Sequence, residues 1–348
     1  MGKLPKISDY VSLMDTPQLL KASILKDGHV VRRGDKIIRY AGGFCVVFPF
    51  QTPMRKYAVR CWHTNVADSQ ERTRKIAQDL SQLHLPYFVR FEYFPEGVVT
   101  NEGIQPMVVM DWVDAQPLKA YIGHFINDGN VLRALANSFL SMVKDLHAHS
   151  LSHGDLQHGN ILVKNSGEIV LVDYDSMYVP SLEGFTDEIK GLEGYQHKLR
   201  WTNEKLTPKA DYFSELVIYT SLMALAKYPQ LWEDLNMEDT ETLLFSSADI
   251  DSEGTSSIFS ILDADDELAS LSNSLKDFMH CQTLNDLLPL EEVLRNPVDG
   301  ISTKWGDNGY RPPVIDNSSL IDNISSTWNV RHHQSQHSSI AESITKKW

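Results

Sequence analysis

Three side chains that could bind a metal ion or accept a proton lie in one short stretch, residues 151–175. Asp155 stands two residues after His153, Asn160 follows five residues later, and Asp173 lies near the end of the stretch. Carboxylate and amide oxygens bind Mg²⁺ together with nucleotide phosphates, and a further carboxylate can take the proton of an attacking hydroxyl. Phosphoryl transfer needs both groups. The spacing therefore predicts Asp155 as the base and Asn160 and Asp173 as ligands of Mg²⁺ or Mn²⁺.

Two short apolar runs must position these residues. Residues 161–163 and 169–172 have the composition of β-strands, and residues 165–167 between them form a turn sequence. An antiparallel hairpin of this length would place Asn160 and Asp173 on the two arms of its open end.

The stretch resembles the catalytic loop H-R-D-x-x-x-x-N and the D-F-G motif of protein kinases, which read HGDLQHGN and DYD in this sequence. The segments YAVR upstream and ADYFS downstream resemble two further kinase motifs in the expected order. The resemblance is to bacterial members of the eukaryotic-like Ser/Thr protein kinases and extends over about residues 37–295. It implies an α+β, bilobal fold, with a small antiparallel β N-lobe that carries one main helix and a larger, mostly helical C-lobe.

This fold would divide the chain into four parts. They are an N-terminal lead-in (1–36), the kinase N-lobe (37–113), the kinase C-lobe (114–297) and a polar, flexible tail (298–348). The tail holds twelve Ser and Thr residues between positions 301 and 348 and few apolar ones. We expect it to be a passive tail, with autophosphorylation or partner binding as the alternatives.

The N-lobe begins with three predicted antiparallel strands, 37–43, 44–50 and 56–62, because their residues change to a β-type pattern. Gly42 and Gly43 form the turn between the first two strands. In the kinase family this turn covers the phosphates, and glycine lets backbone N–H groups approach them. The resemblance therefore implies phosphate contacts at both glycines.

Further nucleotide contacts follow from the same resemblance. Val47 and Ala58 would line the adenine slot, and Arg60 stands where the family has the Lys that grips the α- and β-phosphates. Arginine keeps the charge but presents a bidentate fork in place of a point charge. The carbonyl of Asp111 and the backbone of Val113 would bond adenine, because MVVMDWV is similar to a kinase hinge.

One amphipathic helix is predicted over residues 68–84. The resemblance implies that an acid of this helix pairs with Arg60. Glu71 is the first candidate and Asp79 the second. Gln157 stands where Ser/Thr kinases have a Lys near the transferring phosphoryl group, so the resemblance implies that one positive charge is absent there.

The C-lobe should begin with a helix over residues 131–149, whose apolar residues recur at helical spacing. After Asp173, a span rich in loop residues to about residue 209 suits an activation segment and substrate platform. Asp211 resembles the helix-start Asp that hydrogen-bonds the catalytic-loop backbone. Gly154 replaces the Arg of H-R-D and Asp175 the Gly of D-F-G, so activation by phosphorylation of that segment is less expected.

Composition narrows the classes of partner. The 348 residues carry a net charge of −14, which argues against nucleic acid as the main partner. No apolar run reaches the length of a membrane span, so we expect no membrane segment.

The three cysteines lack metal or disulfide spacing, and the N-terminus has no apolar signal core. A cytoplasmic location is the expectation.

We therefore expect a protein kinase that transfers phosphate from ATP to protein Ser/Thr hydroxyls. Two alternatives stay open. Small-molecule phosphotransferases of the aminoglycoside and choline kinase type share the HGD motif, although only 40 residues separate Val113 from His153, too few for the helical insertion that those enzymes usually carry. A pseudokinase that serves as a nucleotide-binding scaffold is the other.

Overall fold

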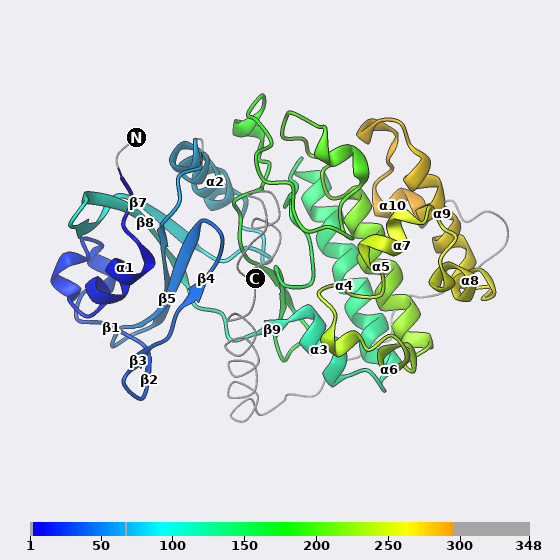
Figure 1. The fold of residues 1–348 in the computed structure, drawn as a ribbon, viewed down its shortest axis with the longest axis horizontal. Helices are drawn as coiled ribbons and strands as arrows, with labels where there is room; N and C mark the ends of the chain where they lie inside the picture. Colours follow the sequence, from blue (N-terminus) through cyan, green and yellow to red (C-terminus); the bar gives the residue numbers. More distant parts are fainter. Residues whose placement is uncertain (1–2, 67, 296–348) are drawn as a thin grey trace.

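The computed structural model describes residues 3–66 and 68–295 of the chain. It has two lobes, a β-rich N-terminal one and a larger helical one (Figure 1). The α+β fold class predicted from the sequence is confirmed. The predicted tail, 298–348, lies outside the described residues.

The N-lobe is built on one antiparallel sheet with the order β1-β5-β6-β8-β7, and β4 pairs with β5. A separate two-stranded ribbon joins β2 to β3. The strands are β1 (His29–Val30), β2 (Arg32–Arg33), β3 (Lys36–Ile37), β4 (Tyr40–Ala41), β5 (Cys45–Gln51), β6 (Lys56–Trp62), β7 (Phe91–Thr100) and β8 (Gly103–Asp111). The strand predicted over 37–43 is thus reduced to β4, while the next two lie as predicted.

The two faces of this sheet have different partners. Side chains alternate along a strand, so Phe48 of β5 and Val59 of β6 enter the N-lobe core. Helix α1 (Ile7–Met14) covers that face and contributes Tyr10 to the same core. Val47, Ala58 and Arg60 belong to the opposite set of the alternation.

Helix α2 (Ser69–Leu83) connects the two lobes. Its apolar face, Ile76 and Leu80, is buried in the large cluster that also contains the C-lobe core. In Figure 1 the helix lies between the sheet and the C-lobe. The main N-lobe helix predicted over residues 68–84 is therefore present.

The C-lobe is helical. Its central helices α4 and α5 pack against each other, and Asp128 caps the start of α4 by accepting from two backbone N–H groups. The α-helices of this lobe are α3 (Leu118–His124), α4 (Gly129–Ala148), α5 (Tyr212–Lys227), α6 (Leu231–Asp234), α7 (Ser247–Asp251), α8 (Ser257–Asp263), α9 (Ala269–His280) and α10 (Leu290–Val293).

Short 3₁₀ turns occur in both lobes. They are η1 (Pro17–Leu19), η2 (Ser23–Leu25), η3 (Pro180–Leu182), η4 (Lys198–Trp201), η5 (Met237–Asp239) and η6 (Leu284–Asp286).

A small sheet at the lobe boundary holds the predicted hairpin. Strand β10 (Ile161–Val163) pairs antiparallel with β11 (Ile169–Leu171) and, on its other edge, with β9 (Gln116–Pro117). The turn contains Gly167 at φ 82°, a conformation that favours glycine.

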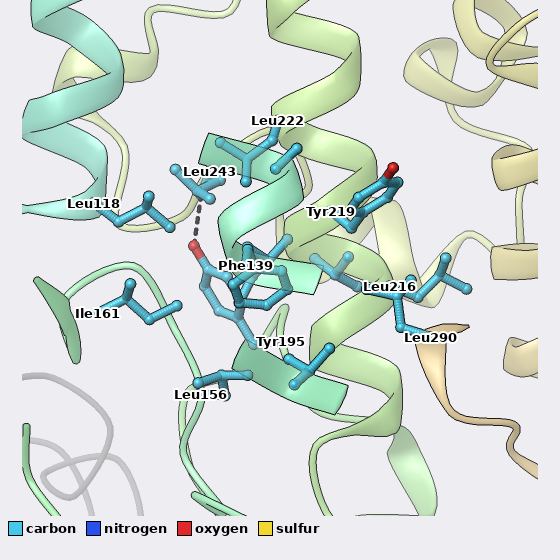
Figure 2. Packing of buried hydrophobic residues seen from close by; sticks show 14 of the residues in the cluster. Leu118, Phe139, Leu156, Ile161, Tyr195, Leu216, Tyr219, Leu222, Leu243 and Leu290 are labelled. Carbon is cyan, nitrogen blue, oxygen red and sulfur yellow. Dashed lines mark hydrogen bonds between the residues drawn. The ribbon is translucent and has the colours of Figure 1, made fainter. Parts of the chain in front are cut away.

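The segment after β11 runs without long helices to α5, as predicted, and it is packed into the C-lobe. Tyr195 is one of its buried side chains. Figure 2 shows this ring among Leu118, Phe139 and Leu156 of the core, with its hydroxyl accepting a hydrogen bond of 2.9 Å from the Leu243 amide. Within the part of the chain that the structure describes, no helix is both long and apolar enough to cross a membrane.

Candidate active site

The β10–β11 hairpin brings the predicted metal ligands together. Its register pairs Ile161 with Leu171, and one step further the Val172 amide donates to the carbonyl of Asn160 at 3.0 Å. Asn160 and Asp173 therefore leave the two arms side by side at the open end. Local sequence is sufficient for this arrangement, because a short hairpin fixes its own register.

Asp155 and Asn160 are in direct contact. The side-chain amide Nδ2 of Asn160 donates to the Asp155 carboxylate oxygen Oδ2 and to its carbonyl oxygen, both at 2.9 Å. The other carboxylate oxygen, Oδ1, accepts from the backbone amide of Leu192 at 2.9 Å. Asp155 is 7 % exposed, and burial raises the pKa of its carboxyl above the ordinary value. A carboxylate held in this way suits a positioned proton acceptor.

Two oxygens at the site have no hydrogen-bond partner. The amide oxygen Oδ1 of Asn160 and the carboxylate oxygen Oδ1 of Asp173 are both buried without a hydrogen bond, although Asp173 Oδ1 lies 3.5 Å from Nη2 of Arg60. Burial, and then the negative charge of Asp175, raise the pKa of Asp173 to about 8. A buried acceptor without a partner is costly, and a divalent cation would satisfy both oxygens.

These two side-chain oxygens are ligands of the kind that Mg²⁺ has in kinases. That ion is bound by one or two protein oxygens together with substrate phosphates and water. Within residues 3–66 and 68–295, no group of three or more His, Cys, Asp or Glu side chains is arranged to hold a metal ion by itself. The site is therefore suited to a metal ion that arrives with the nucleotide.

Glycine at position 154 has a steric reason. Its φ is 77°, and a Cβ built there would overlap the carbonyl oxygen of Ser176. The Gly154 amide donates to Asp211 Oδ1 at 2.9 Å, and the His153 amide donates to Oδ2 of the same carboxylate. The contact implied for Asp211 is present, and the Arg of the usual motif would not fit this backbone.

Tyr174 fixes the direction of the two acids beside it. Its ring is buried, and it packs against Phe88 and Phe91 with centroid distances of 5.7 and 5.3 Å. Its hydroxyl donates to the Leu171 carbonyl at 2.7 Å and accepts from the Val89 amide at 2.8 Å. Because this ring points into the core, Asp173 and Asp175 on either side of it point toward the lobe boundary.

The partner predicted for Arg60 is wrong. Glu71 is exposed and pairs with Arg74 at 2.7 Å, one turn further along α2. Asp79, the second candidate, accepts from the Ser181 amide. Arg60 instead forms a bidentate pair with Asp175, in which Nη1 lies 2.8 Å from Oδ1 and Nη2 contacts Oδ2.

Helix geometry explains the error. At 3.6 residues per turn, Glu71 lies about 140° around the helix from Ile76. The packing of Ile76 and Leu80 against the C-lobe therefore turns Glu71 toward solvent and Arg72 inward. Arg72 is 3 % exposed and donates to the carbonyl of Thr186.

The sheet register places the remaining nucleotide contacts on one face. Val47 lies opposite Arg60 across the β5–β6 pair, and Ala58 lies opposite Met110 across β6–β8. In an antiparallel sheet, directly opposed residues share a face, so these side chains line one surface at the lobe boundary. Asp111 at the end of β8 is paired with Tyr57 and so belongs to the opposite face, which leaves its backbone carbonyl for the predicted adenine contact.

Backbone contacts hold the hinge and the glycine turn. The Asp111 amide donates to the Arg90 carbonyl. The backbone amide of Trp112, the residue before Val113, donates to the Lys56 carbonyl. The Gly42 amide closes the β4–β5 turn on the Cys45 carbonyl at 2.9 Å. A Cβ at Gly43 would meet nothing within 4 Å, so glycine is not sterically required there.

Gln157 is buried in its own loop. Its side-chain oxygen accepts from the Gly159 amide at 2.6 Å, and its carbonyl accepts from the Asn160 amide. The observed role of Gln157 is thus to shape the loop that presents Asn160.

Sequence reasoning missed Asp175 and Leu192 as site residues. A carboxylate in place of the Gly of D-F-G, together with an Arg in place of Lys, was a signal for the Arg60–Asp175 pair. No local pattern indicated the Leu192 amide, since its contact with Asp155 joins residues 37 positions apart.

The family model described as the protein kinase domain matches residues 41–286, and the chain belongs to that family. A comparison with curated proteins finds no match. Family membership identifies the protein as a kinase and implies, in general terms, phosphoryl transfer with ATP and a divalent metal ion.

Proposed function

We propose that this protein transfers the γ-phosphoryl group of ATP to Ser or Thr hydroxyls of proteins, in the manner of the bacterial eukaryotic-like kinases. The observation that carries the proposal is that the two polar atoms of the Asn160 side chain have different surroundings. Its Nδ2 donates to Asp155, while its Oδ1 is buried without a partner beside the catalytic loop. One amide thus orients the base and offers an oxygen to a metal ion.

The mechanism assigns one task to each residue. Asp155 orients the acceptor hydroxyl and takes its proton as the phosphoryl group transfers. Asn160 and Asp173 would hold Mg²⁺, which would neutralise charge on the phosphates, and Arg60 supplies positive charge from the N-lobe. Positioning and charge neutralisation account for most of the rate enhancement.

A protein acceptor is favoured by the segment between Asp173 and Asp211. It is anchored by Tyr195 and by the ion pair of Arg200 with Asp187, in which both side chains are 1 % exposed. This packed segment begins after β11 and lies beside the base, because its Leu192 amide donates to Asp155 at 2.9 Å. The proposed partners are a protein substrate and the chain's own Ser/Thr-rich tail, without nucleic acid or membrane. The cytoplasm is the proposed location. Free thiols suit a reducing compartment, and all three cysteines are free thiols.

One observation favours a second function, a nucleotide-binding scaffold. Both carboxylate oxygens of Asp155 already accept hydrogen bonds, one of them from the Leu192 amide. In a scaffold this contact would keep the acceptor hydroxyl away. In an enzyme, the Leu192 contact leaves further lone pairs on Asp155 for the substrate.

The test is an ATP-turnover assay on the full chain with Mg²⁺ or Mn²⁺, followed by mass spectrometry of phosphorylated residues. Wild-type protein should phosphorylate a protein acceptor or its own tail, and Asp155→Asn should lower kcat by about 10² to 10⁴-fold with little change in the affinity for ATP. Binding of Mg·ATP without turnover would establish the scaffold. Transfer to a sugar or an amine would establish the small-molecule reaction.

A further inference from the structure

The ion pairs of Arg60 are formed with the loop that carries the proposed metal ligand Asp173. Asp175 takes both Nη atoms of the guanidinium, and Asp173 Oδ1 lies 3.5 Å from Nη2. The side chains are 9, 18 and 13 % exposed for Arg60, Asp175 and Asp173. Burial opposes the charge of Arg60, but the nearby carboxylates outweigh it and raise the pKa of the guanidinium.

An arginine can serve a carboxylate and a phosphate at once. The guanidinium has five N–H donors in a planar fork, and the bidentate pair with Asp175 uses one on each Nη. Asp173 Oδ1 and Cys45 also contact the guanidinium, and the N–H donors that these contacts leave can serve a phosphate. A lysine ammonium at this position would have no such fork, so the substitutions of Arg for Lys at 60 and Asp for Gly at 175 suit each other.

Helix α2 contacts the segment after Asp175, and its Arg72 also donates to the Asp175 carbonyl at 3.5 Å. Arg72 donates to Thr186, Lys75 Nζ donates to the Ser181 carbonyl at 3.0 Å, and Asp79 accepts from the Ser181 amide at 3.2 Å. Among residues 69–83, all of them described, none forms an ion pair with Arg60. The helix therefore reaches Asp175 through its backbone carbonyl, whereas Arg60 pairs with its carboxylate.

We propose that Asp175 is the positioning residue for Arg60, so that the metal-binding loop, and not helix α2, sets this cation against the nucleotide phosphates. The inference rests on the proposed function. Asp175 acts through Arg60 and touches no reacting atom. Its consequence is that the carboxylates of α2 are dispensable for turnover, whereas the link between residues 60 and 175 is required.

The experiment is a double-mutant cycle on the full chain with Arg60→Ala, Asp175→Asn and the double variant. Asp175→Asn should lower kcat at least tenfold while the dissociation constant for Mg·ATP changes less than threefold. In the Arg60→Ala background the same change should have a much smaller effect, because the residue acts chiefly through Arg60. Glu71→Gln is the matched control on α2 and should retain wild-type kcat.

Two measurements separate positioning from other roles. Asp175→Asn should keep the Mg²⁺ dependence of nucleotide binding, which Asp173→Asn should lose. Asp175→Glu should restore part of the lost kcat, because the charge is kept. If Asp175→Asn does not fold, the cycle is run with Arg60→Lys and Asp175→Glu, which keep both charges.

Contrary results are distinct. A kcat in Asp175→Asn that is unchanged or higher would show that the pair is dispensable or restrains Arg60, and effects that simply add in the cycle would remove the link between the two residues. Either result overturns the role of Asp175 while leaving the proposed function standing. If the wild-type protein shows no turnover, the proposed function is wrong. The cycle is then measured as the affinity of each variant for fluorescent Mg·mant-ATP. If the effects of the two substitutions on this affinity simply add, the role of Asp175 is overturned as well.

Discussion

Gly154 and Ser176 pack so closely that the catalytic loop has no room for a side chain at position 154. The carbonyl oxygen of Ser176 occupies the place that a Cβ would take, and the φ of Gly154 is 77°. The glycine of the HGD motif is thus a requirement of the segment that follows Asp173.

This contact makes stability sensitive to one methyl group. Gly154→Ala should lower the free energy of unfolding by about 2 kcal/mol or more, because it adds a steric overlap to a left-handed backbone that costs about 1–2 kcal/mol. Urea unfolding followed by circular dichroism measures the loss. Gly43→Ala is the matched control, with no atom within 4 Å of the added Cβ. Equal stability of the two variants would contradict the argument.

The buried pair of Arg200 and Asp187 should hold the segment in place. Asp187→Asn leaves the Arg200 charge buried without its carboxylate, so we expect a loss of about 3–5 kcal/mol or local unfolding of the segment. Limited proteolysis should then cut near residues 187–205. Lys198→Gln, which breaks an exposed pair with Glu253, should cost less than about 1 kcal/mol. A protease-resistant Asp187→Asn variant would refute this.

His147 should make C-lobe stability depend on pH. Its ring nitrogens lie 2.9 Å from carboxylate oxygens of Glu215 and Glu291. Burial opposes the charged ring, but the two carboxylates outweigh it and raise the pKa of His147 to about 9. A pKa raised above its unfolded value of about 6.5 stabilises the fold fully below pH 6.5, and that contribution is lost as the pH rises through 9.

The measurement compares wild type with His147→Gln. The wild type should be more stable by about 2–3 kcal/mol near pH 6, and the difference should shrink as the pH approaches 9 and above. His149→Gln, at an exposed ring on the end of the same helix, is the matched control. A difference that is constant with pH would rule out the charged His147.

Metal binding should be coupled to proton release at Asp173. The pKa of this carboxyl is raised to about 8, chiefly by burial, and a metal ligand must be deprotonated. The affinity for Mg²⁺ with ATP should therefore rise with pH until about pH 8 and then level off. Calorimetry at pH 7 in buffers of different ionisation enthalpy should detect the released proton.

The variant Asp173→Asn supplies the control for this coupling. It should bind ATP without Mg²⁺ dependence, show no turnover and release no proton. Removal of the metal ion from the wild type with EDTA should have the same effect on turnover. Full activity of Asp173→Asn would refute the assignment of this residue as a metal ligand.

The sequence alone determined the hairpin and the residues at its open end. Asp155, Asn160 and Asp173 belong to a span of fewer than twenty residues, and the turn and the two apolar runs fix their register without help from the rest of the chain. Helix α4 was equally predictable, because its apolar spacing is periodic.

Tertiary packing decided the electrostatics around these residues. Glu71 could pair with Arg60 or with its own helix neighbour Arg74, and the burial of Ile76 and Leu80 chose the second by turning α2. The Arg60–Asp175 pair joins residues 115 positions apart. The hydrogen bond from the Leu192 amide to Asp155 joins residues 37 positions apart. Local patterns carry no information on such distances in sequence, since only the docking of the lobes and the segment brings these groups into contact.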